Sequence, residues 1–332
     1  RDDGTWQIES LNWIPLNAVD ETDSKFYEVK NDVFLVDRSN VGTIKSLMGQ
    51  SIVPIVANVA GQNRLRCLGT GFFISCTGLL ITAAHVITDP IDRKYGDVST
   101  FNDLTYHSRR LNLGVMVPSN PIFEVPGFRY FEIEWVQFLT ERRNRPLLIH
   151  GVDLNLASDI AICKVAQIDG GVPHQPLAIV HSGLIGTGMA VGKTAIAVGY
   201  AGMNDVTLSQ VADDVISGDF KLNLHVSKGQ ILERFPDNLE TQSVPTPGPC
   251  FSASAKYSPG MSGSPIFDDE RIYVHGVVSK GWEDENGQTE FGFGSMLAPS
   301  MGLAIESFQG KSLSKLLATG AEGIPKAVIA GA

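Results

Sequence analysis

The chain has 332 residues and a formal net charge of −10, with 43% hydrophobic and 19% charged residues. This composition suits a globular protein with a sizeable core, and the acidic balance argues against a nucleic-acid-binding protein, whose phosphate contacts rely on basic patches. No apolar run reaches the roughly 18 residues that a membrane-spanning helix needs. The length predicts two core units or one large one.

The first 168 residues divide into three kinds of sequence. Residues 1–50 are mixed, and we expect an N-terminal extension packed on the main body, with a short helix near 43–48. From Ser51, β-branched and aromatic runs alternate with Gly, Asn and Thr, which predicts short strands. Residues 87–145 read as an irregular polar insertion, long enough to cover a cleft. Strand character returns in VDLNLASDIAICKVAQI, at 152–168.

The second half of the chain repeats this strand-rich texture. A linker at 169–176 is followed by short strand-like runs up to about residue 300, and the tail at 301–332 begins with a helical pattern, SLSKLLA. The 34 glycines and 17 prolines are spread along the chain, as many short strands and turns require. Two sets of short strands joined by a linker predict an all-β protein of two antiparallel β-barrels, at 51–168 and 169–300.

The four cysteines, Cys67, Cys76, Cys163 and Cys250, are few for a secreted protein stapled by disulfides. Cys67 and Cys76 lie on what reads as one extended path, too far apart for a disulfide. The sequence also lacks an Asn-x-Ser/Thr glycosylation site. These features favour the cytoplasm, whereas the start at Arg1 leaves an exported mature form as the alternative.

Three segments carry the side chains of a nucleophilic site. His85 follows the strand-like run LLITAA, Asp159 precedes the buried run IAIC, and Ser262 lies between two glycines in GMSGSP. A hydroxyl is a poor nucleophile near neutral pH unless a base lies within hydrogen-bond reach, and that base needs a carboxylate to orient it. The three residues are therefore predicted to form a catalytic triad. Asp153 is a rival for the carboxylate, and a simple turn serine is the alternative for Ser262.

These segments resemble the trypsin/chymotrypsin-like serine peptidase family in its less disulfide-rich bacterial form, similar to the glutamyl endopeptidase and high-temperature-requirement branches. GTGFFIS and GLLITAAHV resemble the strands before the catalytic histidine, SDIAICKV the aspartate strand, and GMSGSP the nucleophile loop. The likeness covers about residues 51–300 and implies two barrels of the chymotrypsin-like type. It also implies that Ser262 is the nucleophile, His85 the general acid and base, Asp159 its orienter, and the N–H groups of Gly260 and Ser262 the oxyanion hole.

The resemblance further implies a serine endopeptidase that acts on protein or peptide substrates through an acyl-enzyme, without a metal or organic cofactor. Ser279, Lys280 and Gly281 match the strand on which the family pairs extended substrate. A catalytically silent or gated member of the fold that binds proteins is the alternative. Met261 stands where digestive relatives have the aspartate that pairs with a freed N-terminus, so we expect packing to hold the loop here.

Two residues compete for the main specificity pocket that the resemblance implies. Lys256 lies six positions before Ser262, near the floor of that pocket in the family. A buried lysine needs an anionic partner, which an acidic substrate side chain would supply. In the alternative interpretation, Tyr257 fills the pocket and Lys256 faces solvent.

Overall fold

The computed structural model describes most of the chain, and the structural statements below refer to that part. It covers residues 25–30, 33–34, 51–58, 64–88, 96–102, 105–111, 113–118, 128–141, 147–149, 152–166, 174–180, 189–203, 205–212, 215–218, 223–236, 243–268, 273–283 and 289–325. The short helix expected near 43–48 lies outside these residues.

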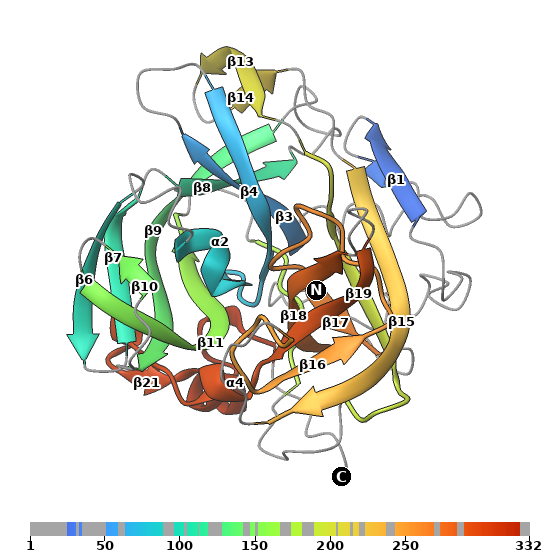
Figure 1. Cartoon of the computed structure of the whole chain (residues 1–332). Helices are drawn as coiled ribbons and strands as arrows, with labels where there is room; N and C mark the ends of the chain where they lie inside the picture. Colours follow the sequence, from blue (N-terminus) through green and yellow to red (C-terminus); the bar gives the residue numbers. More distant parts are fainter. Residues whose placement is uncertain are drawn as a thin grey trace.

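Six strands close into an antiparallel barrel in the first half of the chain (Figure 1). In order around the barrel they are β3 (Ile52–Asn58), β4 (Arg64–Phe73), β5 (Leu79–Thr82), β11 (Val152–Val165), β9 (Phe128–Glu141) and β8 (Leu113–Pro118). The barrel closes because β8 pairs with both β9 and β3. The carboxyl end of β5 and the middle of β11 therefore lie on neighbouring strands.

Further strands extend the sheet of this barrel. They are β6 (Gly96–Asn102) and β7 (Thr105–Leu111) beside β9, β10 (Leu147–Ile149) beside β11, and the hairpin of β13 (Val206–Ala212) and β14 (Val215–Gly218) between β4 and β9. Residues 206–218 fall within the range expected for the second barrel, yet their ladder bonds join the first sheet.

The interpretation of residues 87–145 as an irregular insertion is wrong. This range holds β6, β7, β8 and β9, and two of these strands form part of the barrel wall. In β9 the side chains of Phe131, Ile133 and Trp135 are buried, while the two glutamates between them are exposed. That alternation is the pattern of a strand with one face on a core.

A second closed antiparallel barrel of six strands follows (Figure 1). Its order is β12 (Thr194–Tyr200), β17 (Pro265–Phe267), β18 (Val274–Glu283), β19 (Thr289–Met296), β16 (Cys250–Ala253) and β15 (Asn223–Phe235), and β15 pairs back with β12. From the N-terminal region, β1 (Lys25–Lys30) pairs with β15, and β2 (Val33–Phe34) pairs with β1. The predicted fold, two antiparallel β-barrels, is confirmed.

The C-terminal segment adds short elements to the outside of the barrels. They are α3 (Ala298–Met301), β20 (Ala304–Ile305), the 3-10 turn η4 (Glu306–Phe308), β21 (Lys311–Ser312), α4 (Leu313–Thr319) and the 3-10 turn η5 (Ala321–Gly323). The predicted helix at SLSKLLA is confirmed. Ser312 caps it by accepting a hydrogen bond from the N–H of Lys315, and Gly320 ends it in the left-handed conformation.

One apolar core fills the first barrel and continues beyond it. Ile196 and Val198 of the second barrel belong to this core, and so do Leu316 and Leu317 of α4. A separate cluster around Phe251 fills the interior of the second barrel. The barrels therefore share buried apolar contacts as well as hydrogen bonds. None of the helices described has the length and apolar character of a membrane span, and the four cysteines are free thiols.

Candidate active site

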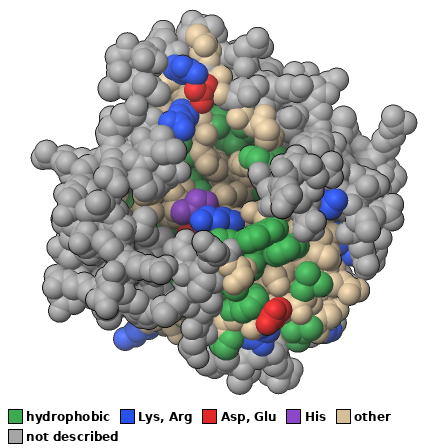
Figure 2. All heavy atoms as spheres, in the orientation of Figure 1, with side chains coloured by type: hydrophobic (Ala, Val, Ile, Leu, Met, Phe, Trp, Pro, Cys, Tyr) green, Lys and Arg blue, Asp and Glu red, His purple; other side chains and the backbone are tan. Residues whose placement is uncertain are grey.

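His85 lies at the start of a short helix between the barrels. The strand β5 ends at Thr82, and α2 (Ala84–Thr88) begins two residues later. His85 therefore lies three residues past the end of the strand, in the helix, whereas the sequence predicted it at the strand end. Its side chain keeps 29% of its surface exposed, whereas His174, His225 and His275 are buried. Figure 2 shows a histidine in a hollow at the centre of this face, beside a basic side chain.

Asp159 is the carboxylate that contacts His85. Its Oδ2 lies 2.8 Å from His85 Nδ1, and its Oδ1 accepts a 2.9 Å hydrogen bond from the backbone N–H of His85. Asp159 stands within β11, at an irregularity where the register with β9 shifts between Leu156 and Ala161. Such bulges redirect side chains. The rival Asp153 pairs with Leu148 of β10, six residues earlier on the same strand.

The Asp159 carboxylate is buried but well satisfied. It has three hydrogen bonds, two from His85 and one from the hydroxyl of Ser279. Burial alone would raise the pKa of Asp159, but the His85 charge and these hydrogen bonds outweigh it and hold the pKa below its usual value. The group is therefore an anion at neutral pH, which fixes the proton of a neutral His85 on Nδ1 and leaves Nε2 as the basic nitrogen.

Ser262 is displayed on the loop between β16 and β17, and two glycines give this loop its shape. Gly260 and Gly263 have φ of +93° and +89°, a region that favours glycine. A Cβ atom at Gly263 would lie 2.0 Å from the carbonyl oxygen of Thr70 and 2.2 Å from Oγ1 of Thr82. The Gly-x-Ser-Gly pattern thus permits both the turn and its close contact with the first barrel.

Thr70 of β4 fastens this loop to the first barrel. Its N–H donates to the carbonyl of Ser262 over 2.8 Å, and its hydroxyl donates to the carbonyl of Gly260 over 3.0 Å. The same hydroxyl accepts the N–H of Tyr200, and the Thr70 carbonyl accepts the hydroxyl of Thr82. The side chain of Met261 is fully buried, so packing and these bonds hold the loop.

Two backbone N–H groups on the loop are unused. Within the part of the chain that the structure describes, the N–H groups of Gly260 and Ser262 donate to no other group. The Ser262 hydroxyl stands beside them. Two free donors next to a hydroxyl are what an oxyanion hole requires.

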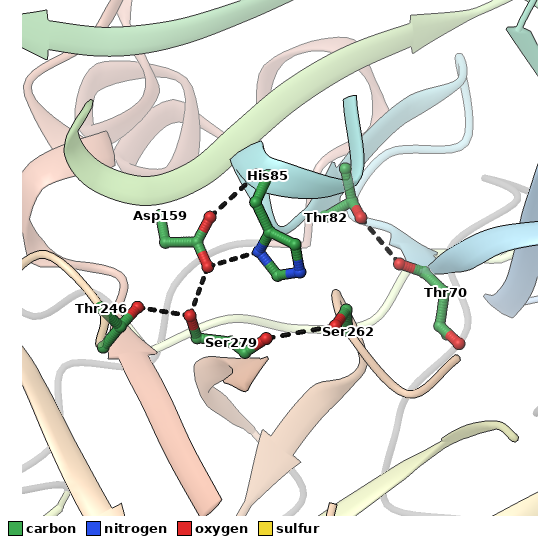
Figure 3. A network of polar contacts seen from close by, with 7 residues as sticks. All are labelled: Thr70, Thr82, His85, Asp159, Thr246, Ser262 and Ser279. Carbon is green, nitrogen blue, oxygen red and sulfur yellow. Dashed lines mark hydrogen bonds and ion pairs between the residues drawn. The ribbon is translucent and has the colours of Figure 1, made fainter. Parts of the chain in front are cut away.

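The Ser262 hydroxyl donates to the carbonyl oxygen of Ser279 over 3.1 Å. A hydroxyl has one proton, so in this arrangement the proton is not shared with His85. Figure 3 shows Ser262 on the side of the His85 ring that is turned away from Asp159. Ser262 and His85, the candidate nucleophile and base, are therefore neighbours without a direct hydrogen bond.

Ser279 links Asp159 to Ser262. It lies in β18 where the register with β19 shifts between Val278 and Lys280. Its side chain is bonded to Asp159 and to the hydroxyl of Thr246, while its carbonyl accepts from Ser262 (Figure 3). Sequence reasoning placed Ser279 on a substrate strand only and missed its side-chain contact.

The threonines around the site were missed altogether. Thr70, Thr82 and Thr246 are buried and contact the catalytic candidates or their loop. Thr70 and Thr82 stand in the segments GTGFFIS and GLLITAAHV, which were interpreted only as strands before His85, and Thr246 stands in no such segment, so no residue pattern indicated these side-chain contacts.

The remaining site candidates lie in β18 and in the segment between β16 and Ser262. The strand β17 pairs with β18 only as far as Val277, and Val278 is bonded to the backbone of Gly263 and Ser264. Half-buried Lys280 and exposed Gly281 lie beyond the β17 ladder on β18. Lys256 is exposed, so it is not the buried cation considered from the sequence. Tyr257 is buried against Gly292, where an added Cβ atom would lie 2.1 Å from its ring.

A metal site is not apparent in the described part of the chain, because no three His, Cys, Asp or Glu side chains there are placed to hold an ion. His174 illustrates a structural histidine. Its ring stacks on Phe73 with centroids 4.1 Å apart, and burial lowers its pKa to about 4. It therefore stays neutral at physiological pH.

Comparison with known proteins identifies the family of this chain. The trypsin-like peptidase domain family matches residues 69–277, which is more than half of the chain. No curated protein matches the sequence. Solved structures that match the chain include the Rv3671c protease from M. tuberculosis in its active form, with 17% identity, 87% of each chain covered and a TM-score of 0.39. The MamO protease domain from Magnetospirillum magneticum has 12% identity over 76% of this chain and 94% of that chain, with a TM-score of 0.41. Deg5 has 15% identity over 74% of this chain and 84% of that chain, with a TM-score of 0.40.

Proposed function

The chain belongs to the trypsin-like peptidase family, and we propose that it is a serine endopeptidase that cleaves peptide bonds through an acyl-enzyme. The observation that carries the proposal is the contact of part-exposed His85 with buried Asp159, beside the Ser262 loop. A peptidase fold alone does not imply activity, because folds host many functions. The side-chain arrangement supplies the specific argument.

Each group in the site has a role in this reaction. His85 Nε2 takes the proton of the Ser262 hydroxyl as the oxygen attacks the substrate carbonyl, and later gives that proton to the leaving amine. Asp159 holds the tautomer and stabilises the imidazolium that forms. The free N–H groups of Gly260 and Ser262 bind the oxygen on which negative charge develops, and losing one such donor typically costs about 100- to 1000-fold in rate.

The reaction requires one movement of the nucleophile. The Ser262 hydroxyl must leave the carbonyl of Ser279 and rotate about χ1 toward His85. A change between staggered side-chain positions is a small movement, and catalytic hydrogen bonds are often long or poorly aligned before substrate binds. This arrangement favours a complete site, in which the Ser262 hydroxyl has yet to turn toward His85, over a site in which a catalytic group is missing.

Substrate would bind as an added strand. The edge of β18 that lies beyond the β17 ladder begins beside the active-site residue Ser279 and includes Gly281. An extended peptide can pair with such an edge through backbone hydrogen bonds. Tyr257, buried against Gly292, would limit the depth of the pocket behind this edge, and exposed Lys256 would not select acidic side chains from its floor.

Labelling with a fluorophosphonate probe tests the proposal. The wild type is expected to be labelled covalently, and Ser262→Ala is expected to abolish labelling because the attacking oxygen is gone. Ser264→Ala is a matched control on the same loop, since its buried hydroxyl has no hydrogen-bond partner, and it should keep the label. A folded wild type that stays unlabelled, under conditions that label trypsin, would instead support a silent binding protein.

A further inference from the structure

Thr246 lies behind the candidate triad, in the segment that precedes β16. Its side chain is almost completely buried, with 1% of the residue exposed. Its Oγ1 is hydrogen-bonded to Oγ of Ser279, which is in turn bonded to Oδ2 of Asp159 (Figure 3). The backbone of Thr246 is tied nearby, because its carbonyl accepts from the thiol of Cys250 over 3.7 Å.

The direction of these hydrogen bonds follows from counting protons. The Asp159 carboxylate can only accept, so the single proton of the Ser279 hydroxyl must point to it. Ser279 Oγ then has only lone pairs for its second neighbour. The hydroxyl of Thr246 must therefore donate to Ser279, and the chain runs from Thr246 through Ser279 to Asp159.

The position of Ser279 depends strongly on its hydrogen bond from Thr246. The β18–β19 register shifts between Val278 and Lys280, so Ser279 has no residue opposite it in that ladder. Its carbonyl also accepts the Ser262 hydroxyl. A rotation or displacement of Ser279 would disturb both the donor to Asp159 and the resting position of the nucleophile.

We propose that Thr246 is a positioning residue, whose hydroxyl fixes Ser279 as a donor to Asp159 and thereby tunes the His85–Asp159 pair; the catalytic consequence rests on the function proposed above. Successive hydrogen bonds in a chain polarise one another, by about 10–30% per bond. Loss of the Thr246 donor weakens the bond from Ser279 and leaves more negative charge on Asp159. The proton on His85 is then held more tightly.

Two titratable groups face Asp159 from the elements described around it. They are His85 from α2 and the thiol of Cys250 from β16. Burial and the Asp159 charge raise the pKa of Cys250 to about 12. The Cys250 thiol therefore stays protonated across the acid range. A shift of a pH profile in that range thus reports on the His85–Asp159 pair and not on Cys250.

The test compares Thr246→Val, which keeps the shape but loses the donor, with Thr246→Ser, which keeps it. The rate of fluorophosphonate labelling is measured against pH. We expect Thr246→Val to slow labelling about fivefold and to move the midpoint of the acid limb upward by about 0.3–0.5 pH unit. Thr246→Ser should restore the wild-type profile. Ser300→Ala removes a buried hydroxyl in α3 that donates to the carbonyl of Leu297, and it should leave the midpoint unchanged.

A double variant distinguishes a positioning role of Thr246 from an effect on protein stability alone. In Ser279→Ala, the link between Thr246 and Asp159 is broken, so adding Thr246→Val should shift the midpoint no further. A further shift of the same size, or an unchanged midpoint in Thr246→Val with only a lower melting temperature, would overturn the proposal.

An NMR measurement that needs no catalysis tests the role of Thr246 independently of the proposed function. In Ser262→Ala protein, the NMR shift of the His85 Nδ1 proton is compared with and without Thr246→Val. We expect a change with Thr246→Val and none with Thr246→Ser. Identical shifts in all three proteins would overturn the inference, whereas an unlabelled wild type would count only against the proposed function.

Discussion

The Asp159 carboxylate shows how a single buried charge makes stability depend on pH. Its pKa is lowered in the folded protein, so it contributes stability fully above its unfolded value, about 3.9. That contribution is lost as the pH falls through the lower, folded value. We therefore expect the difference in unfolding free energy between wild type and Asp159→Asn to shrink from pH 5 to pH 2.

Urea unfolding at a series of pH values measures this difference. Asp205→Asn provides a control, because Asp205 pairs with Arg64 at the surface, where ion pairs contribute only about 0–1 kcal/mol. Its effect should stay small throughout. A wild-type advantage over Asp159→Asn that is equal at pH 5 and pH 2 would contradict the argument.

Sequence reasoning reached the residue types of the site but not all of its contacts. The triad candidates stand in short motifs, and the structure brings His85 and Asp159 into contact with Ser262 nearby. The supporting contacts join residues remote along the chain, with 120 positions between Ser279 and Asp159 and 33 between Thr246 and Ser279. A motif records local chemistry, whereas these bonds depend on which strands become neighbours.

At the scale of elements, β9 shows where the sequence interpretation failed although the signal was present. The run FEIEWVQF alternates apolar and polar residues at its start, as a half-buried strand does. The basic pairs Arg109-Arg110 and Arg142-Arg143, on either side of this run, made the region read as a polar insertion. The longer-range pairing that builds β9 into the barrel wall cannot be read from the sequence, because register depends on the partner strands.

The alternation in β9 gives a matched pair of substitutions. Ile133 is fully buried in the first-barrel core, and Ile133→Ala is expected to cost about 2–5 kcal/mol because it leaves a cavity. Glu132 is exposed on the opposite face of the strand, so Glu132→Ala should change stability by less than about 0.5 kcal/mol. Denaturant unfolding compares the two. Similar, small effects would show that β9 does not face a packed core.

At the scale of the whole molecule, the candidate site depends on contact between the barrels. The first barrel carries His85 and Asp159, and the second carries Ser262. Besides the apolar core they share, Thr70 in the first barrel donates two hydrogen bonds to the nucleophile loop of the second and accepts a third from Tyr200. The geometry of the candidate site therefore depends on the interface between the barrels, because neither barrel carries all three side chains.

This interface gives the last prediction. Thr70→Val keeps the side-chain shape but removes the hydroxyl that holds the Gly260 carbonyl and accepts the Tyr200 N–H. Leaving a buried N–H unsatisfied costs about 1–3 kcal/mol. Freeing the Gly260 carbonyl also loosens the loop that presents the oxyanion donors, so we expect fluorophosphonate labelling to slow by about tenfold, a barrier change of about 1.4 kcal/mol. Thr70→Ser retains the hydroxyl and should label at nearly the wild-type rate. If Thr70→Val melts earlier but labels as fast as wild type, Thr70 stabilises the interface without shaping the reaction centre.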